Sequence, residues 1–521
     1  MLLGLLLIGG CVASPSAKPP GERPVVDRRG VEFPPGLEMT VAVKNLTAAT
    51  ALATGMAGDV YVADRGARGD EVRIQRLDAD TGELVEIYPA RKAIVSWFDR
   101  RERYFGPVGG LAWRNGELYA SVRDAADAGL IVAFDLRGWT PDDGRPPVRT
   151  VVADLPAQGD HGVTALAFHP INGRLFFGVG SATNSGVVGL DNWRSGWVSD
   201  HPGFRDRPLV PLKIFGYRFD TDDPAAGLLN PDKVNTAPFN AFGRSGQRIA
   251  AALDGKPTAA IYSVNPRGGD LVVEAHGLRM PAGLAFNTFA NLWATNQGME
   301  MRGTRPVKDD PDALVRVYAS GATDAAGWYG WPDFSADLRP ITDPAFQPPR
   351  QLLARTGYAE LSFLIERSRA AGATEGLVTP DRSTLLGAAF PSLSGASGLA
   401  FVPANQPGLE AAEGQAVVAL RGDRAPLATS GLPLRRPQGR LLAIVDLEGG
   451  TWRPLVYNTS EEDDRPPVLH RPVDVAFDGN GGLWLLDQGQ MRIRDGREKF
   501  KPGTGRLLRL AAQDAPTTQP K

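Results

Sequence analysis

Gly159–Asn184 reads G-D-H-G-V-T-A-L-A-F-H-P-I-N-G-R-L-F-F-G-V-G-S-A-T-N, two short apolar runs around an Asn-Gly turn. Such a pattern is typical of a β-hairpin. Because the strands of a hairpin run antiparallel, Asp160 and His161 at the entrance should lie at the same end as Ser181–Asn184 at the exit. Chemistry placed at the ends of such hairpins can therefore converge in space.

The same unit recurs along the chain. Each copy has a small-residue approach, an apolar strand, a polar turn and a second apolar strand. The six copies are Ala49–Asp64, Gly109–Asp124, Val163–Ser181, Ala282–Asn296, Ser397–Leu420 and Val473–Asp487. Further strand-like runs lie between them, at Arg149–Asp154, Leu271–Ala275 and Arg440–Leu447. Recurrence of this kind indicates a repeat architecture.

The repeats predict an all-β fold, a six-bladed β-propeller with loop and short-helix insertions on one face. A lone hairpin is marginally stable, and strands this apolar must be covered on both faces. Each copy with its following strands makes a four-stranded blade, and a radial array protects the blade edges. A pair of β-sandwiches does not predict six near-copies. Residues at the hairpin ends should then ring one pocket on the propeller axis.

Two intervals between copies are too long for one blade, namely Thr183–Leu278 and Gln297–Gly395. Within them, Ser245–Leu253 and Glu360–Ala371 have apolar residues at helical spacing, which predicts short helices. Insertions of this length usually decorate the functional face of a fold.

Composition narrows the function classes. The 61 Gly and 43 Pro indicate many turns, and the net charge of -2 gives no reason to expect a nucleic acid partner. With one cysteine, the chain can form neither an internal disulfide nor a cysteine-based metal cluster.

The chain opens with M-L-L-G-L-L-L-I-G-G-C, an apolar run too short to span a bilayer but typical of a secretory signal. Ile8–Cys11 resembles the bacterial lipoprotein box, so we expect residues 1–11 to be a signal with Cys11 lipidated; an ordinary signal peptide is the alternative. We expect a flexible tether over 12–35, the propeller over 36–510 and a disordered tail over 511–521. The expected location is the bacterial cell envelope, lipid-anchored and periplasmic or outer-membrane facing, or outside the cell.

Several motifs together resemble the glucose/sorbosone dehydrogenases, the soluble quinoprotein sugar dehydrogenase family. They are the opening hairpin, G-L-R-M-P-A-G-L-A-F…L-W-A-T-N-Q-G at Gly277–Gly298, K-D-D-P-D-A-L-V-R-V at Lys308–Val317, Y-G-W-P at Tyr329–Pro332 and the run His470–Asp487. The resemblance implies a six-bladed propeller that oxidises a small sugar, an aldose or related alcohol, with pyrroloquinoline quinone (PQQ) and Ca²⁺. The chain has no C-x-x-C-H haem motif, so electrons would pass to a separate acceptor.

The resemblance also assigns roles. His161 matches the general base that removes the substrate hydroxyl proton, and Arg279 matches the arginine over the quinone carbonyls. Asp160 matches the neighbour of the base on the rim, where we expect it to contact the cofactor. A neutral His suits proton removal, and a guanidinium stabilises a developing oxyanion.

The remaining assignments concern cofactor and metal. Gly298 and Met299 match the loop whose backbone carbonyls hold calcium, a cation that prefers oxygen ligands. Arg471 matches an arginine that pairs with cofactor carboxylates, and Arg421 stands where some members have lysine; arginine forks suit carboxylates. Met280 departs from the Asn that the family often has.

Other interpretations remain open. His161 can also be interpreted as a hydrogen-bonded structural residue. Arg279 can be interpreted as a residue that donates only to loop carbonyls. Asp309, Asp310 and Asp312 are also readable as a cap before a helical turn.

Two rival functions stand beside the dehydrogenase. One is a non-catalytic propeller that binds a protein or glycan on its rim. The other is a gluconolactonase-like metal-dependent hydrolase, whose site would gather Asp64, Asp124, Asn184 and Asp487 around one axial metal.

Overall fold

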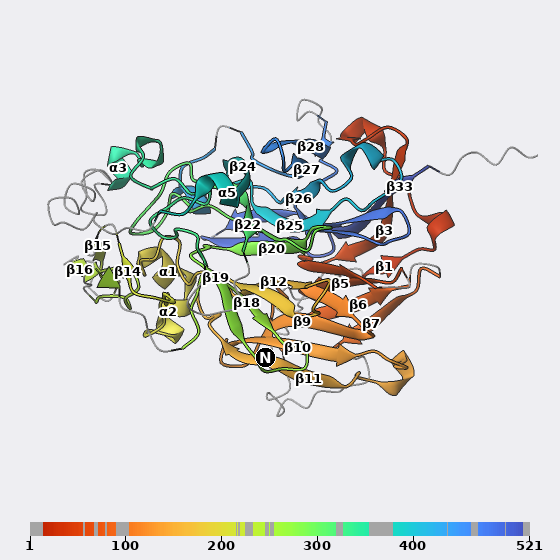
Figure 1. The fold of residues 1–521 in the computed structure, drawn as a ribbon, viewed down its shortest axis with the longest axis horizontal. Helices are drawn as coiled ribbons and strands as arrows, with labels where there is room; N and C mark the ends of the chain where they lie inside the picture. Colours follow the sequence, from red (N-terminus) through yellow and green to blue (C-terminus); the bar gives the residue numbers. More distant parts are fainter. Residues whose placement is uncertain are drawn as a thin grey trace, which may run out of the picture.

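Six blades stand side by side around a common axis in the computed structural model (Figure 1). The structure describes residues 14–55, 58–66, 71–78, 81–89, 104–214, 216, 219–224, 233–244, 249–250, 255–318, 327–353, 379–434, 436–459, 467–494 and 496–513. The six blades confirm the predicted six-bladed propeller.

The first three blades each begin with one of the predicted hairpins. Blade 1 is β4 (Ala51–Thr54), β5 (Val60–Asp64), β6 (Arg73–Leu77) and β7 (Leu84–Tyr88). Blade 2 is β8 (Leu111–Arg114), β9 (Glu117–Arg123), β10 (Gly129–Asp135) and β11 (Val148–Leu155). Blade 3 is β12 (Val163–Phe168), β13 (Leu175–Val179), β18 (Ala260–Val264) and β19 (Val272–His276), with β23 (Gly327–Trp328) parallel to β19.

The other three follow the same plan. Blade 4 is β20 (Pro281–Phe286), β21 (Leu292–Asn296), β22 (Pro311–Val317) and β24 (Leu386–Ser392). Blade 5 is β25 (Ala396–Phe401), β26 (Ala416–Leu420), β27 (Leu441–Asp446) and β28 (Thr451–Asn458). Blade 6 is β29 (Pro472–Phe477), β30 (Gly482–Asp487), β33 (Gly505–Ala512) and β3 (Leu37–Leu46).

The ring closes because β3, near the start of the chain, pairs with β33, near its end. Each inner strand contacts the next, in the order β4, β8, β12, β20, β25 and β29, and β29 contacts β4. These six strands line a central cavity of about 280 Å³. Apolar side chains fill the space between blades; Ile74 of blade 1 and Leu118 of blade 2, for example, are both fully buried in one cluster.

The segment expected to be a flexible tether differs from that expectation. β1 (Ser16–Ala17) pairs with β3, and β2 (Val31–Glu32) pairs with β28. The cause is apolar burial, because Val31 and Phe33 lie in the core between blades 5 and 6. Cys11 and residues 514–521 of the expected tail lie outside the described residues.

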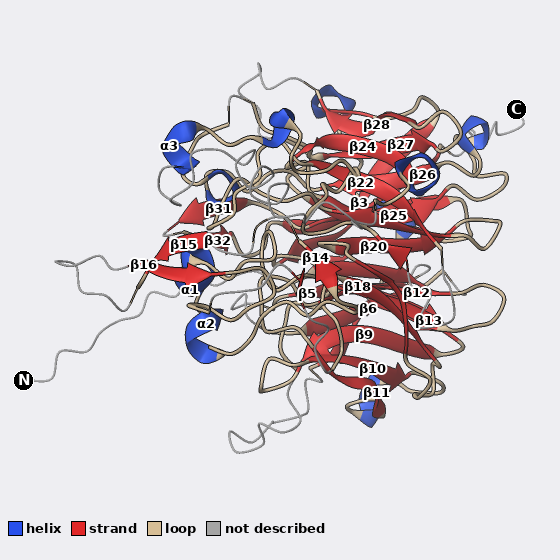
Figure 2. Cartoon of the chain, turned by 60° about the vertical axis from the view of Figure 1, so that its left-hand side comes forward, coloured by secondary structure: helices blue, strands red, loops and turns tan. Residues whose placement is uncertain are grey.

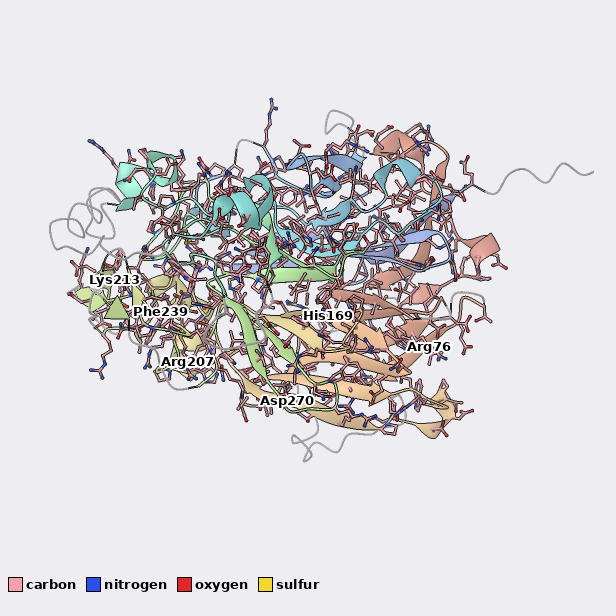
Figure 3. All side chains as sticks on the ribbon, viewed as in Figure 1. Arg76, His169, Arg207, Lys213, Phe239 and Asp270 are labelled. Atoms are coloured by element: carbon pink, nitrogen blue, oxygen red, sulfur yellow. The ribbon has the colours of Figure 1, made fainter. Side chains whose placement is uncertain are left out.

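The insertions gather on one side of the blades, where Figure 2 shows α1, α2, β15, β16, β31 and β32 together. Their bounds are α1 (Leu190–Ser195), α2 (Trp197–Asp200), β14 (Leu212–Lys213), β15 (Phe219–Asp222), β16 (Lys233–Thr236), β17 (Ile249–Ala250), α3 (Arg350–Leu353), α5 (Arg382–Leu385), β31 (Met491–Arg494) and β32 (Arg497–Phe500). Lys213 and Phe239 of the first insertion lie at the left of Figure 3, whereas Arg76 of β6 lies at the right. None of the described helices is long and apolar enough to cross a membrane.

Two local predictions need correction. Ile249–Ala250 forms β17, which pairs with β14, so the helix expected over Ser245–Leu253 is wrong there. The helical turn expected after Asp310 is wrong as well, because Pro311 begins β22. In both places a pairing strand outweighs the local pattern. The helix expected over Glu360–Ala371 lies outside the described residues.

Candidate functional site

His161 lies at the end of blade 3 where the hairpin entrance and exit meet, as predicted. Gly180 N–H donates to the Gly162 carbonyl at 3.0 Å, which joins the two sides. The His161 Nδ1 lies 2.9 Å from the Ser181 carbonyl oxygen. Because a carbonyl only accepts, Nδ1 carries the proton and Nε2 keeps its lone pair.

The imidazole is neutral as well as oriented. His161 is 8% exposed. Burial first, and then the nearby charge of Arg279, lower the pKa of His161 to about 3. A neutral imidazole with an unprotonated Nε2 has the form that a general base requires.

Arg279 is held beside it by two loop carbonyls. Its Nε donates to the Asn184 oxygen at 3.0 Å, and its Nη1 donates to the Gly298 oxygen at 2.7 Å. Its Nη2 is buried and has no hydrogen-bond partner among the described residues. Burial lowers the pKa of Arg279 to about 10, so the guanidinium stays charged at neutral pH with one donor group open.

Glu300 is the carboxylate nearest to that open donor, at 3.7 Å from Nη2 of Arg279. It accepts from Nε of Arg302 at 2.5 Å and from Nη2 of Arg424 at 3.0 Å. Burial alone would raise the pKa of Glu300, but the three guanidiniums hold it well below its usual range. Sequence reasoning missed Glu300, since a Glu-x-Arg pair is common and its other partners, Arg279 and Arg424, are remote in the chain.

Asp160 faces the insertion. Its Oδ2 accepts from Nη2 of Arg302 at 2.6 Å, and its Oδ1 accepts from Asn192 Nδ2 at 3.0 Å and Trp197 Nε1 at 2.9 Å. Nη1 of Arg302 in turn donates to Asp191 Oδ2 at 2.5 Å. Asp160 therefore ties blade 3 to α1 and α2, and its expected contact with a cofactor stays a prediction.

A cavity of about 1280 Å³ opens between the insertion and the blades. Asp160, Arg302 and Arg424 line it, together with residues of α1, α2 and the β31–β32 hairpin. His161 and Arg279 are buried next to this lining and are not part of it. The volume exceeds the range of most small-ligand pockets, about 300–1,000 Å³.

Arg421 and Arg471 reach the same rim from blades 5 and 6. Nη2 of Arg421 donates to Gln297 Oε1 at 3.0 Å, and Nη1 of Arg471 donates to the Asp423 carbonyl oxygen at 2.8 Å. Neither guanidinium is ion-paired with a carboxylate in the described part of the chain. Burial lowers the pKa of both, to about 10 for Arg471. Cations that are largely shielded from water and have no carboxylate partner favour an anionic ligand.

Glu498, on the β31–β32 hairpin, supplies negative charge from above. Its Oε1 lies 3.4 Å from Nη1 of Arg424. Burial would raise its pKa, but Arg424 and then Arg471 lead the arginines that lower it overall. The hairpin therefore places one carboxylate close to the arginines of blades 5 and 6.

The Gly298–Met299 loop is fixed by two aspartates of blade 4. Gly298 N–H donates to Asp312 Oδ1 at 2.8 Å, and Met299 N–H donates to Asp310 Oδ2 at 2.6 Å. A side chain on Gly298 would place a Cβ 2.5 Å from the backbone carbonyl oxygen of Asp310, so only glycine fits. The two aspartates are thus loop anchors, with no helix for them to cap.

The expected calcium ligands differ in availability. The Gly298 oxygen already accepts from the Arg279 guanidinium, and a cation on the same oxygen would be repelled. The Met299 side chain packs in an apolar cluster with Val307 and Trp331. Gly298 is therefore not open to a metal ion in this arrangement, and calcium binding stays a prediction.

The four residues of the rival hydrolase site make separate local contacts. Asp64 pairs with Arg73, and Asp487 pairs with Arg506. Asp124 accepts from Ala128 N–H, and Asn184 Nδ2 donates to the Glu300 carbonyl oxygen. The described residues contain no group of three His, Cys, Asp or Glu that could hold a metal.

The chain matches no protein-family model and no curated protein by sequence. Among solved structures it is similar to the holo form of the PQQ domain of pyranose dehydrogenase from Coprinopsis cinerea. That likeness has a TM-score of 0.53 at 13% identity, over 95% of this chain and 100% of that one. The chain shares the fold of that PQQ domain. The resemblance read from the sequence motifs is confirmed at the level of the fold.

Two further similar structures have lower scores. One is a calcium structure of Trichoderma reesei Carbohydrate-Active Enzymes Family AA12, with a TM-score of 0.49 at 17% identity, over 93% of this chain and 98% of that one. The other is the soluble aldose sugar dehydrogenase of Escherichia coli in its apo form, with a TM-score of 0.47 at 12% identity, over 92% of this chain and 100% of that one.

Proposed function

We propose that the protein is a PQQ-dependent dehydrogenase that oxidises an aldose or related alcohol and passes the electrons to a separate carrier. One observation carries the proposal. The 181–184 loop holds both a neutral imidazole with a free Nε2 and a guanidinium with an open N–H, at His161 and Arg279. The proposed oxidation requires the protein to remove a hydroxyl proton and to stabilise an oxyanion.

The residues present fit an anionic quinone. Arg279 Nη2 and Arg421 Nε are buried donors without partners among the described residues, and Arg421 and Arg471 have no paired carboxylate. Guanidiniums of this kind suit the carboxylates and carbonyl oxygens of PQQ. When bound, PQQ supplies the hydride acceptor.

His161 and Arg279 divide the protein's share of the chemistry. Nε2 of His161 takes the hydroxyl proton of the substrate, while Nδ1–H stays bonded to Ser181. Because Ser181 fixes the tautomer, the ring does not need to reorient before proton transfer. Nη2 of Arg279 donates to the oxygen on which negative charge develops.

Calcium is the second part of the proposal, with Gly298 and Met299 as backbone ligands. Binding through Gly298 requires Arg279 Nη1 to leave its oxygen. Calcium titration of the purified protein by calorimetry, with and without PQQ, tests this part separately. Absence of binding in both titrations would exclude calcium from the proposal without affecting the role of His161 as the base.

The main test is reconstitution of the purified full chain with PQQ and Ca²⁺, followed by dye reduction with a panel of sugars. We expect a spectral shift of bound PQQ and turnover with at least one aldose. PQQ binding without turnover on any sugar or alcohol would overturn the dehydrogenase assignment.

A non-catalytic propeller that binds a protein or glycan on its rim is the second candidate. The observation in its favour is Glu300, whose carboxylate already lies among Arg279, Arg302 and Arg424. In this case neither PQQ binding nor any effect of His161→Gln on turnover is expected.

We further propose that the protein is exported and anchored through Cys11. Because Ser16–Ala17 pairs with β3, only residues 12–15 separate the anchor from the propeller, a reach of roughly 14 Å when fully extended. Membrane fractionation of the Cys11→Ser variant tests this, with release into the soluble fraction as the expected result.

A further inference from the structure

Asp206 is a fully buried carboxylate in the insertion, beneath the hairpin exit of blade 3. It is 0% exposed and accepts three hydrogen bonds. Ala182 N–H donates to Oδ1 at 2.6 Å, Thr183 Oγ1 donates to Oδ2 at 2.6 Å and Thr258 Oγ1 donates to Oδ1 at 2.8 Å. Burial raises its pKa to about 6, although the three hydrogen bonds act in the opposite direction.

Two of those three donors belong to the loop that carries the site. The Ser181 oxygen, one residue before Ala182, is the partner of His161 Nδ1. The Asn184 oxygen, one residue after Thr183, accepts from Arg279 Nε at 3.0 Å and from Trp331 Nε1 at 3.2 Å. Asp206 therefore accepts hydrogen bonds from the middle of a loop, and the two ends of this loop bind His161 and Arg279.

We propose that Asp206 is a positioning residue that fixes the 181–184 loop, so that one buried carboxylate orients both His161 and Arg279. Its effect on turnover rests on the proposed function, whereas its effect on the His161 tautomer does not. A buried carboxylate is costly unless its oxygens are hydrogen-bonded, and here the donors that satisfy it are those of the loop. Residues that lock a site's side chains from behind are often as important as the groups that touch the substrate.

The geometry predicts how an amide would act in its place. In Asp206→Asn an NH₂ group replaces one oxygen. At Oδ2 it would leave the Thr183 hydroxyl without its acceptor, and at Oδ1 it would face the Ala182 N–H, which is also a donor. We expect the loop to shift and the hydrogen bond of His161 Nδ1–H to Ser181 to weaken.

The decisive measurement is ¹⁵N NMR of the full chain labelled at histidine, without cofactor. The chain has five histidines, and His161→Gln assigns the signal. We expect the Nδ1–H tautomer alone in the wild type and a mixture of tautomers in Asp206→Asn. Asp474→Asn is the control, because Asp474 is a partly buried carboxylate of blade 6 that accepts from Leu52 N–H of blade 1 and not from the 181–184 loop.

Turnover gives the second readout. With PQQ and substrate, we expect kcat of Asp206→Asn to fall about 10- to 100-fold with little change in KM, as for a misplaced catalytic group. Thr258→Val removes the one donor to Asp206 that lies outside the loop, which loosens the hold of Asp206 on the loop, and should shift the tautomer less in the same direction. This variant decides the matter if Asp206→Asn does not fold. A wild-type tautomer in every folded variant would overturn the inference. A tautomer shift in a protein that never turns over would support the positioning role and refute the dehydrogenase assignment.

Discussion

The guanidinium of Arg279 donates to the carbonyl oxygen of Gly298 over 2.7 Å. The two groups were expected to face a cofactor and a calcium ion, and here they satisfy each other. A cation on the Gly298 oxygen would have to displace Nη1 of Arg279, whereas an anion can bind the open Nη2 without breaking this bond. Cation binding at Gly298 is therefore coupled to release of the guanidinium, and anion binding at Nη2 is not.

Arg279→Gln should separate these two events. Loss of the guanidinium removes an oxyanion donor, so we expect turnover to fall by at least about 100-fold. Calcium affinity should stay equal or increase, because the cation that competes for Gly298 is gone. Steady-state kinetics and calcium calorimetry check the two halves, and weaker calcium binding would contradict the coupling.

His161→Gln should abolish turnover while leaving PQQ binding in place, because the side chain removes a proton and does not grip the cofactor. A drop in kcat of about 100-fold or more is expected. His169→Gln is the matched control, since His169 lies in the β12–β13 turn and accepts from Ile171 N–H there. Equal activity of both variants would show that His161 is structural.

The pH profile of kcat should lack the decline at acidic pH that protonation of a catalytic histidine usually causes. With a pKa lowered to about 3, His161 stays neutral throughout the range from pH 8 to pH 5, so its protonation does not reduce kcat there. Unfolded chains protonate the same ring near pH 6.5, so the folded state loses stability as pH falls from about 6.5 toward 3. Urea melts should show a smaller slope in His161→Gln than in the wild type, because His276, whose pKa burial lowers to about 4, contributes the same dependence to both.

Glu300→Gln should weaken the fold and strengthen anion binding. Removing one partner of a buried ion pair costs about 3 kcal/mol or more, and here the carboxylate serves Arg302 and Arg424 together. The freed guanidiniums should bind PQQ more tightly than the wild type does. Chemical denaturation with and without PQQ measures both effects. Glu117→Gln, at the half-exposed pair with Arg149, is the control for generic charge loss.

Arg421→Met should have the opposite pair of effects. Its guanidinium is partly buried, and within the described residues it donates to Gln297 and forms no ion pair, so an apolar side chain of similar length relieves a desolvation cost. We expect the unliganded protein to become more stable and PQQ affinity to fall. Arg316→Met, at the half-buried arginine that donates to Asn291, serves as the control in both melts and titrations. Unchanged PQQ affinity in Arg421→Met would exclude this guanidinium from the ligand site.

The hairpins could be predicted from the sequence because their information is local. Strand, turn and strand lie within about twenty residues, and His161 meets Ser181 inside one such unit. Glu300 and Asp206 could not be predicted, because their partners come from other blades or from the insertion. Asp310 shows the same limit, since a carboxylate before a proline reads as a helix cap until the neighbouring strand is known. Local pattern therefore determined the blades, and long-range pairing determined the site.

The pairing of β3 with β33 sets the order in which the molecule can be made. Ribosomes release the chain from its beginning, so β3 emerges early and has to wait for a strand that is synthesised almost last. Until β33 is synthesised, the propeller stays open, blade 6 has an unpaired strand edge and the residues around the central axis are not yet assembled. A deletion that removes either β3 or β33 should therefore leave a protein that aggregates during synthesis.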